Sequence, residues 1–214
     1  MDSVELMSQF VVLWDAVQQV QLTDRPDEIV WRWTANGAYT SKSAYLAQLK
    51  GTFCTFDAQS IWHAHAEGKH RFFAWLLVQS KILTADKLVA RNWLCDTNCA
   101  LCDQVHETAA HLCLHCSYAK QVWLAMSNWT SGAIHILAVQ DEGVEDWWNR
   151  SLALLPVAQK RSVAAILMYT CWNLWKERNR RVFDQKCLQP HEVVQLIKEE
   201  VNLRRVACGT PMVF

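Results

Sequence analysis

Apolar residues recur at helical spacing along most of this chain. Between residues 4 and 20 they fit a short amphipathic helix, and similar patterns cover 61–66, 69–79 and 118–126. Thr84 is well placed to cap one further short helix. The pattern of apolar and polar positions therefore predicts a mainly α-helical protein.

The last third of the chain predicts two longer helices. Pro156 has the fixed φ that suits a helix start, and apolar residues follow it at intervals of three and four as far as Leu174. Gln189 and Pro190 then interrupt the pattern, because proline cannot continue a helix in its interior. A last amphipathic helix is expected over residues 191–207.

One segment departs from helical spacing. Apolar side chains alternate over residues 29–33, and the Asn36-Gly37 pair that follows favours a turn with positive φ. These features predict a small β-hairpin. Ser41 or Ser43 is expected to cap the helix that comes next.

Residues 99–116, “CALCDQVHETAAHLCLHC”, concentrate four cysteines and three histidines in eighteen positions. Zinc prefers thiolate and imidazole ligands in tetrahedral geometry. The two residues between Cys99 and Cys102 let both sulfurs reach one ion, and His111 with Cys116 supplies a second pair. The cluster therefore predicts a zinc site.

Two other interpretations of this cluster stay open. Free cysteines are common in protein cores and need no metal there. Four neighbouring side chains are also close enough in sequence to replace one of the ligands: Cys95, His106, Cys113 and His115. The two pairs at ligand spacing make the zinc site the preferred interpretation.

The predicted zinc is structural. Four protein ligands leave no open position on the ion at which a water or a substrate could react. The chain also carries no Asp-Asp pair, P-loop, H-E-x-x-H or G-x-S-x-G sequence. We therefore expect neither an enzyme nor a small-molecule substrate.

Together these elements predict a mainly α fold with a small β-hairpin, in which a zinc-stapled helical domain precedes a C-terminal helical segment. The zinc-binding domain is assigned to residues 1–126. Residues 127–143 are the least regular stretch and are expected to form a loop or hinge. The C-terminal helical segment then spans 144–214.

The order and spacing of several segments resemble a known family. The segments are “DEIVWRWTANGAYTSKSAY”, “IWHAHAEGKHRFFAWLLVQSKILTADKLVARNW” and the cysteine cluster. Together they look like the zinc-binding domain found downstream of reverse transcriptase in plant LINE-type retrotransposons, and “CWNLWKERNRRVFD” is similar to the helical tail after that domain. The resemblance implies Cys99, Cys102, His111 and Cys116 as ligands, places the family's glutamate at Glu107, and implies a nucleic-acid accessory role.

The net charge is zero but unevenly distributed, because the acidic middle of the chain lies between basic neighbours. A nucleic-acid surface needs lysine and arginine to neutralise phosphates, and tryptophan can stack on bases. Two groups of residues are candidates for contacts with a nucleic acid or another partner: Lys69, Arg71, Lys81, Lys87 and Arg91, and Trp172, Trp175, Lys176, Arg178, Arg180 and Arg181.

A protein partner is the preferred expectation. The chain has twelve tryptophans, a residue type enriched at the centres of protein interfaces, and its cysteine cluster is acidic rather than basic. The sequence therefore predicts a non-catalytic, retrotransposon-derived protein-interaction module, with RNA or DNA binding as the alternative. The tryptophans of the second group have a plainer interpretation as core residues beside a solvated helix end.

An intracellular location, in the nucleus or cytoplasm, is expected. The nine cysteines are an odd number and the first residues carry acids rather than a basic leader, which favours a reducing compartment over secretion. The longest strongly apolar run, 162–175, is too short to span a bilayer. No membrane partner is expected.

Overall fold

The computed structural model describes residues 3–20, 29–49, 58–134 and 142–208. The chain divides into two compact units, residues 1–55 and 56–214. The boundary predicted from the sequence was instead a loop or hinge at 127–143. In the structure the helices before and after that stretch share one core, while residues 135–141 lie outside the described part.

The first unit contains α1 (Ser3–Gln18) and α2 (Ser41–Gln48). The helix predicted from the apolar pattern at 4–20 is confirmed as α1. Thr40, rather than a serine, caps α2: its hydroxyl accepts a hydrogen bond from the Ser43 amide, and the Ser43 hydroxyl accepts one from the Thr40 amide, both at 3.0 Å. This reciprocal pair fixes where α2 begins.

The predicted β-hairpin at 29–39 is wrong, since the described residues of this segment contain no strand. The turn itself forms: Gly37 has a φ of +66°, and its carbonyl accepts a hydrogen bond of 2.8 Å from the Trp31 amide. However, the Asn36 side chain accepts from the Ala38 amide, and the Thr34 hydroxyl donates to the Ala38 carbonyl. These local side-chain bonds take the backbone groups that a strand ladder needs.

The second unit is helical. Its elements are α3 (Gln59–Trp62), α4 (Gly68–Val78), α5 (Ala85–Val89), the π-helical turn η1 (His111–His115), α6 (Ser117–Trp129), α7 (Val144–Ala153), α8 (Val157–Asp184) and α9 (Pro190–Cys208). The helices predicted in this region are therefore confirmed, except that the one expected at 61–66 ends at Trp62.

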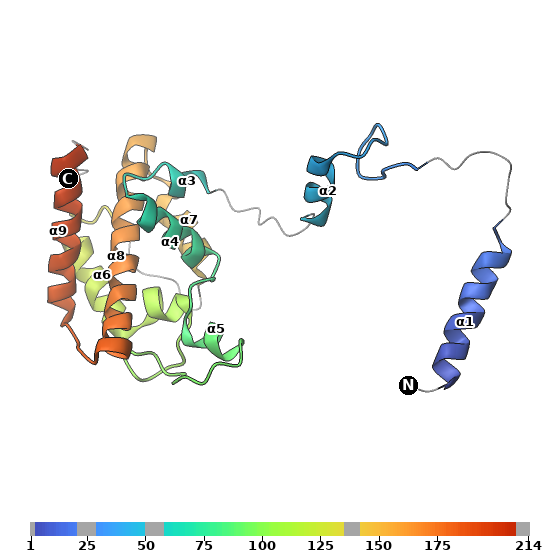
Figure 1. The fold of residues 1–214 in the computed structure, drawn as a ribbon. Helices are drawn as coiled ribbons and strands as arrows, with labels where there is room; N and C mark the ends of the chain where they lie inside the picture. Colours follow the sequence, from blue (N-terminus) through green and yellow to red (C-terminus); the bar gives the residue numbers. More distant parts are fainter. Residues whose placement is uncertain (1–2, 21–28, 50–57, 135–141, 209–214) are drawn as a thin grey trace. The chain divides into compact units, whose positions relative to one another are not determined.

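Helix α8 forms the centre of this unit and lies between α9 and α4 (Figure 1). Every residue from 163 to 171 is buried, so this part of α8 is enclosed on all sides. A helix in that position must be apolar around its whole circumference. That requirement explains the long apolar run that the sequence shows at 162–175.

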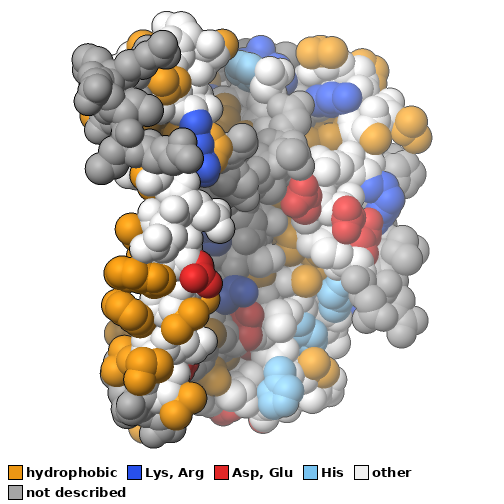
Figure 2. All heavy atoms as spheres, turned by 90° about the vertical axis from the view of Figure 1, so that its right-hand side faces the viewer, with side chains coloured by type: hydrophobic (Ala, Val, Ile, Leu, Met, Phe, Trp, Pro, Cys, Tyr) orange, Lys and Arg blue, Asp and Glu red, His pale blue; other side chains and the backbone are white. Residues whose placement is uncertain are grey.

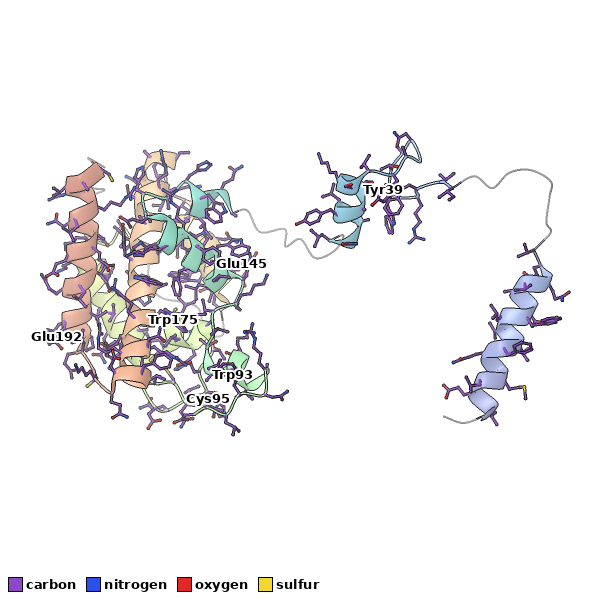
Figure 3. All side chains as sticks on the ribbon, viewed as in Figure 1. Tyr39, Trp93, Cys95, Glu145, Trp175 and Glu192 are labelled. Atoms are coloured by element: carbon purple, nitrogen blue, oxygen red, sulfur yellow. The ribbon has the colours of Figure 1, made fainter. Side chains whose placement is uncertain are left out.

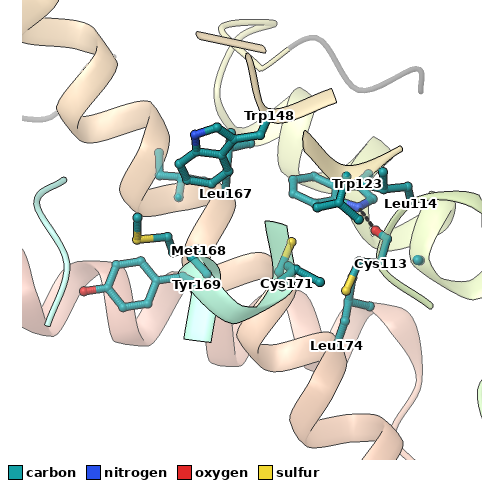
Figure 4. Packing of buried hydrophobic residues seen from close by; sticks show 14 of the residues in the cluster. Cys113, Leu114, Trp123, Trp148, Leu167, Met168, Tyr169, Cys171 and Leu174 are labelled. Carbon is teal, nitrogen blue, oxygen red and sulfur yellow. Dashed lines mark hydrogen bonds between the residues drawn. The ribbon is translucent and has the colours of Figure 1, made fainter. Parts of the chain in front are cut away.

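Tryptophans fill much of the core. Trp123 and Trp147 meet edge to face with ring centroids 5.3 Å apart, and Trp148 lies beside Trp147. The indole nitrogen of Trp123 donates to the carbonyl of Cys113 at 2.7 Å (Figure 4). That of Trp148 donates to the Ser60 hydroxyl at 2.9 Å. Trp123 and Trp148 are thus core residues whose indole N–H groups are hydrogen-bonded, and Trp147 is buried beside them, so none of the three is an interface residue.

None of the described helices combines the length and the apolar character that crossing a membrane requires.

A buried histidine joins α4 to α8 and α9. His70 is only 2 % exposed and packs edge-on against the rings of Tyr169 and Trp172. Its Nδ1 lies 2.9 Å from the Glu67 carboxylate, and its Nε2 lies 3.8 Å from that of Glu200. Burial lowers the pKa of His70 below its usual 6.5, even though both carboxylates favour the charged form.

The second unit should therefore lose stability in mild acid. Because the pKa of His70 is lower in the folded chain than in the unfolded chain, the unfolded state binds more protons as the pH falls below about 6.5. We expect His70→Gln to reduce the decline in the free energy of unfolding between pH 7 and pH 5.5. Urea denaturation across this range measures it, with His191→Gln on the exposed face of α9 as the control. Equal pH slopes in the two variants would contradict the assignment.

Candidate metal centre

The first two cysteines of the cluster lie in a tight turn formed by residues 99–103, called here the knuckle turn. The carbonyl of Cys99 accepts hydrogen bonds from the amides of Cys102 and Asp103, at 3.2 Å and 2.7 Å. Asp103 takes a left-handed φ of +55°, a conformation that aspartate tolerates. The Cys99 amide then bonds the Val105 carbonyl at 2.8 Å and closes the loop. The turn brings both sulfurs to one side.

The second pair comes from the π-helical turn η1. The Cys116 amide donates to the carbonyl of His111 at 2.7 Å, a bond across five residues. In an α-helix two residues five apart point about 140° away from each other. The wider π turn brings them close to the same direction instead, and such turns occur often at functional sites.

The knuckle turn and η1 bring four side chains together: Cys99, Cys102, His111 and Cys116. Their ligand atoms all lie within 4.8 Å of one another. The Sγ atoms of Cys99 and Cys116 are 3.9 Å apart, and Cys102 Sγ lies 3.3 Å from His111 Nε2. Around a tetrahedral zinc ion, the expected separations are about 3.8 Å between sulfurs and about 3.5 Å between sulfur and nitrogen. The donor set and its geometry fit zinc.

The pKa shifts of Cys116 and His111 favour the forms that zinc binds, whereas that of Cys99 favours the thiol. A hydrogen bond between the two thiols lowers the pKa of Cys116, and the same bond, together with burial, raises that of Cys99. Burial, followed by the neighbouring His115, lowers the pKa of His111, so its imidazole is neutral at pH 7. Thiolate and neutral imidazole are the forms that zinc binds.

The four alternative ligands lie outside this cluster. Cys95 is exposed at the end of the unit near α5, beside Trp93 (Figure 3), and His106 is also exposed. Cys113 faces the core, where contact with Cys171 and burial raise its pKa. His115 lies 2.9 Å from the carbonyl of Glu142 through its Nε2.

A buried ion pair attaches the metal segment to α8. Glu107, 1 % exposed, and Arg178, 7 % exposed, make a two-pronged contact whose shortest distance is 2.8 Å. The same carboxylate accepts a hydrogen bond of 2.9 Å from the Ala85 amide at the start of α5. Glu107 therefore joins three segments of the chain: α5, the segment before η1, and α8.

A second arginine of α8 contacts the knuckle turn itself. Arg181 donates to the carbonyl of Leu101 at 2.9 Å and to that of Ala100 at 3.3 Å. Arg181 also pairs with the buried carboxylate of Glu177, which accepts hydrogen bonds from Arg180 and from the Leu188 amide as well. The last two turns of α8 thus hold the knuckle turn in place with charged hydrogen bonds.

The structure separates the two groups of candidate contact residues. In the group on α8, the three arginines make the internal bonds described above, and Lys176 pairs with Glu200 of α9 at 2.8 Å. Trp172 and Trp175 pack against Phe73, and Trp175 lies among the helices in Figure 3. This group acts mainly inside the fold.

The other group lies on the surface. Lys69, Lys81 and Arg91 are exposed, while Arg71 and Lys87 are partly exposed. Phe72, which follows Arg71 on α4, is exposed and stacks on Trp75 with ring centroids 5.9 Å apart, and Lys81 lies over the Trp75 ring. These residues combine positive charge with accessible aromatic rings.

The sequence missed the structural role of two arginines. Arg178 falls at helical spacing from Cys171 and Leu174, on the buried stripe of α8. A charged residue on an apolar stripe signals a buried partner, because an unpaired charge is costly in a core. Arg181 pairs locally with Glu177, four residues earlier, but no comparable signal marks its bonds to backbone carbonyls 80 and 81 residues away.

Comparison with known proteins gives one match. Residues 39–123 match the family described as zinc-binding in reverse transcriptase. No curated protein and no solved structure matches the chain. The matched segment contains all four side chains of the cluster, so this part of the chain fits a reverse transcriptase zinc-binding domain.

The cluster predicts one zinc ion per chain. Cys116→Ser should reduce the zinc content far below that ratio, because serine is a poor zinc ligand and three donors remain. Cys187→Ser removes an exposed thiol outside the cluster and should leave the ratio unchanged. Atomic absorption on purified protein measures both. Full zinc content in Cys116→Ser, with loss in Cys113→Ser, would show that the ligand set is a different one.

The Glu107–Arg178 pair predicts a large stability loss when one partner is removed. Arg178→Met leaves Glu107 buried without a counter-charge, and we expect a loss of about 3–5 kcal/mol in the free energy of unfolding. The double variant Glu107→Gln with Arg178→Met should recover part of this loss. Urea denaturation measures it. The control, Lys176→Met, breaks a partly exposed pair and should cost about 1 kcal/mol or less; equal losses would refute the buried-pair account.

Proposed function

We propose that this chain is a non-catalytic zinc-binding module of retroelement origin that acts as a protein-interaction domain. The match over residues 39–123 and the four-residue cluster support the zinc-binding part. In this proposal Cys99, Cys102, His111 and Cys116 ligate the ion. The zinc supplies a cross-link between the knuckle turn and η1, and the arginines of α8 keep that cross-linked segment in place.

The interaction role rests on α1. Its large apolar residues are exposed, including Phe10 at 58 % and Trp14 at 53 %. Hydrophobic side chains gather along its surface in the space-filling view (Figure 2). Phe10, Leu13, Trp14 and Val17 follow the spacing of a helix that inserts one face into an apolar groove of a partner. Exposed apolar surface of this kind marks interaction sites.

Nucleic-acid binding is the second candidate. The exposed basic residues beside Phe72 and Trp75 support it, since this combination suits a single strand whose bases stack on aromatic rings. Against it, the arginines of α8 are engaged inside the fold, so they do not extend this basic surface. The balance favours a protein partner.

The sequence resemblance supports a finer origin, a plant LINE-type element, with the protein acting in the nucleus or cytoplasm. The similarity of the segment 171–184 to the tail of such elements is the basis for this part of the proposal.

Two measurements on the zinc-loaded chain separate the candidate functions. Titration with single-stranded RNA and duplex DNA across a salt series should give weak binding with a shallow dependence on salt, because few phosphates are neutralised. Submicromolar binding with a log–log slope of several would instead make nucleic acid the leading function.

The second measurement tests α1 directly. A photo-crosslinking amino acid at Leu13 should form a discrete adduct with a protein in cells, and Phe10→Asp should abolish it by placing a charge in the apolar contact. The same crosslinker at Tyr45, exposed on α2, is the control and should not give that adduct. A Leu13 adduct that is insensitive to Phe10→Asp would contradict docking through this face.

A further inference from the structure

The second unit contains a pocket that none of the features above uses. It has a volume of about 540 Å³ and lies where α3, the last turns of α7 and the first turn of α8 meet. Pockets of a few hundred Å³ have the size of small-molecule sites. The metal cluster and α1 contribute no residue to its walls.

The charge of this pocket is positive. Lys160 and Arg161 line it, and no aspartate or glutamate does. Within the described residues, neither Lys160 nor Arg161 forms an ion pair. Arg161 is held in place, because its Nε donates a hydrogen bond of 2.8 Å to the carbonyl of His63. That bond leaves the terminal nitrogens of the guanidinium available to a ligand.

The pKa of the neighbouring His65 is affected by the positive charge of Arg161. The His65 amide donates to the Arg161 carbonyl at 3.0 Å, so His65 lies directly behind the pocket wall. Burial lowers the pKa of His65, and the positive charges of Arg161, Arg204 and Arg71 lower it further. Of these three cations Arg161 is the one that lines the pocket, while Arg204 pairs with Glu67 at 3.3 Å.

Hydrogen-bond donors complete the wall. The Ser60 hydroxyl oxygen accepts from the Trp148 indole, which leaves its own proton to donate. Val157 opens α8, and the residue before it, Pro156, makes no side-chain capping bond, so the first amides of this 28-residue helix keep their donors. Free amides at a helix start favour an anion.

We propose that this pocket binds a phosphate group carried by a nucleotide-sized organic molecule. Lys160, Arg161 and the first amides of α8 contact the phosphate. Leu152, Ala153 and Val157 supply an apolar wall for the rest of the ligand, and Asn149 offers an amide group. The positive side chains recognise the phosphate. A bare anion would leave most of the 540 Å³ unfilled, and the apolar wall offers a contact for the rest of a larger ligand.

Isothermal titration of the zinc-loaded full chain with adenosine 5′-monophosphate tests this proposal. We expect saturable binding that Lys160→Gln weakens about tenfold or more, the effect of losing one hydrogen bond to a charged group. The matched control is Lys186→Gln, which removes the same charge from an exposed position after α8 and should leave the affinity unchanged. Ala153→Glu, which adds a carboxylate to the pocket wall, should abolish binding.

Three results would overturn the proposal: no saturable binding at millimolar nucleotide, equal losses in Lys160→Gln and Lys186→Gln, or adenosine binding as tightly as its monophosphate. A competing 5′-phosphorylated oligonucleotide distinguishes the source of the ligand. Displacement of the mononucleotide identifies the end of a nucleic-acid strand as a ligand, and its absence identifies a free nucleotide. Because α1 is not involved, failure of this test leaves the proposed protein-interaction function unaffected.

Discussion

The position of the metal segment depends on the buried contact between Glu107 and Arg178. A single carboxylate receives the guanidinium of α8 and the first amide of α5, so three segments meet at one group. Removing charges from water is costly, and this pair repays the cost only because its geometry is two-pronged and its remaining lone pairs are used. Zinc on its own would order the knuckle turn and η1. It would not determine where that segment lies against the helical core.

The other arginines at the end of α8 also make internal contacts, so this basic stretch contributes little to the surface. Glu177 occupies Arg180 and Arg181, while Arg181 also reaches two carbonyls of the knuckle turn. A stretch that looks like a nucleic-acid ligand from its composition is thus a support for the metal segment. Accessible positive charge in the second unit is found at other places, including α4 beside Phe72 and the α3–α7–α8 pocket.

Local features could be read from the sequence and long-range ones could not. The helices follow from apolar spacing, and the four clustered side chains follow from donor chemistry and short separations. The prediction of a hairpin was wrong because the side chains of Asn36 and Thr34 bond the backbone groups of Ala38. The alternation of apolar residues does not reveal these bonds. The roles of Arg178 and Arg181 depend on partners some 71 to 81 residues away, beyond any local pattern.

That separation has a consequence for the newly made chain. All four clustered side chains leave the ribosome well before α8 does, so an ion could be captured early. The carboxylate of Glu107 stays hydrated until Arg178 has been synthesised, because Arg178 is the positively charged partner that it has in the folded chain. Contacts across so many residues form late in folding. A nascent chain halted before α8 would carry a metal-loaded loop with no helix to receive it.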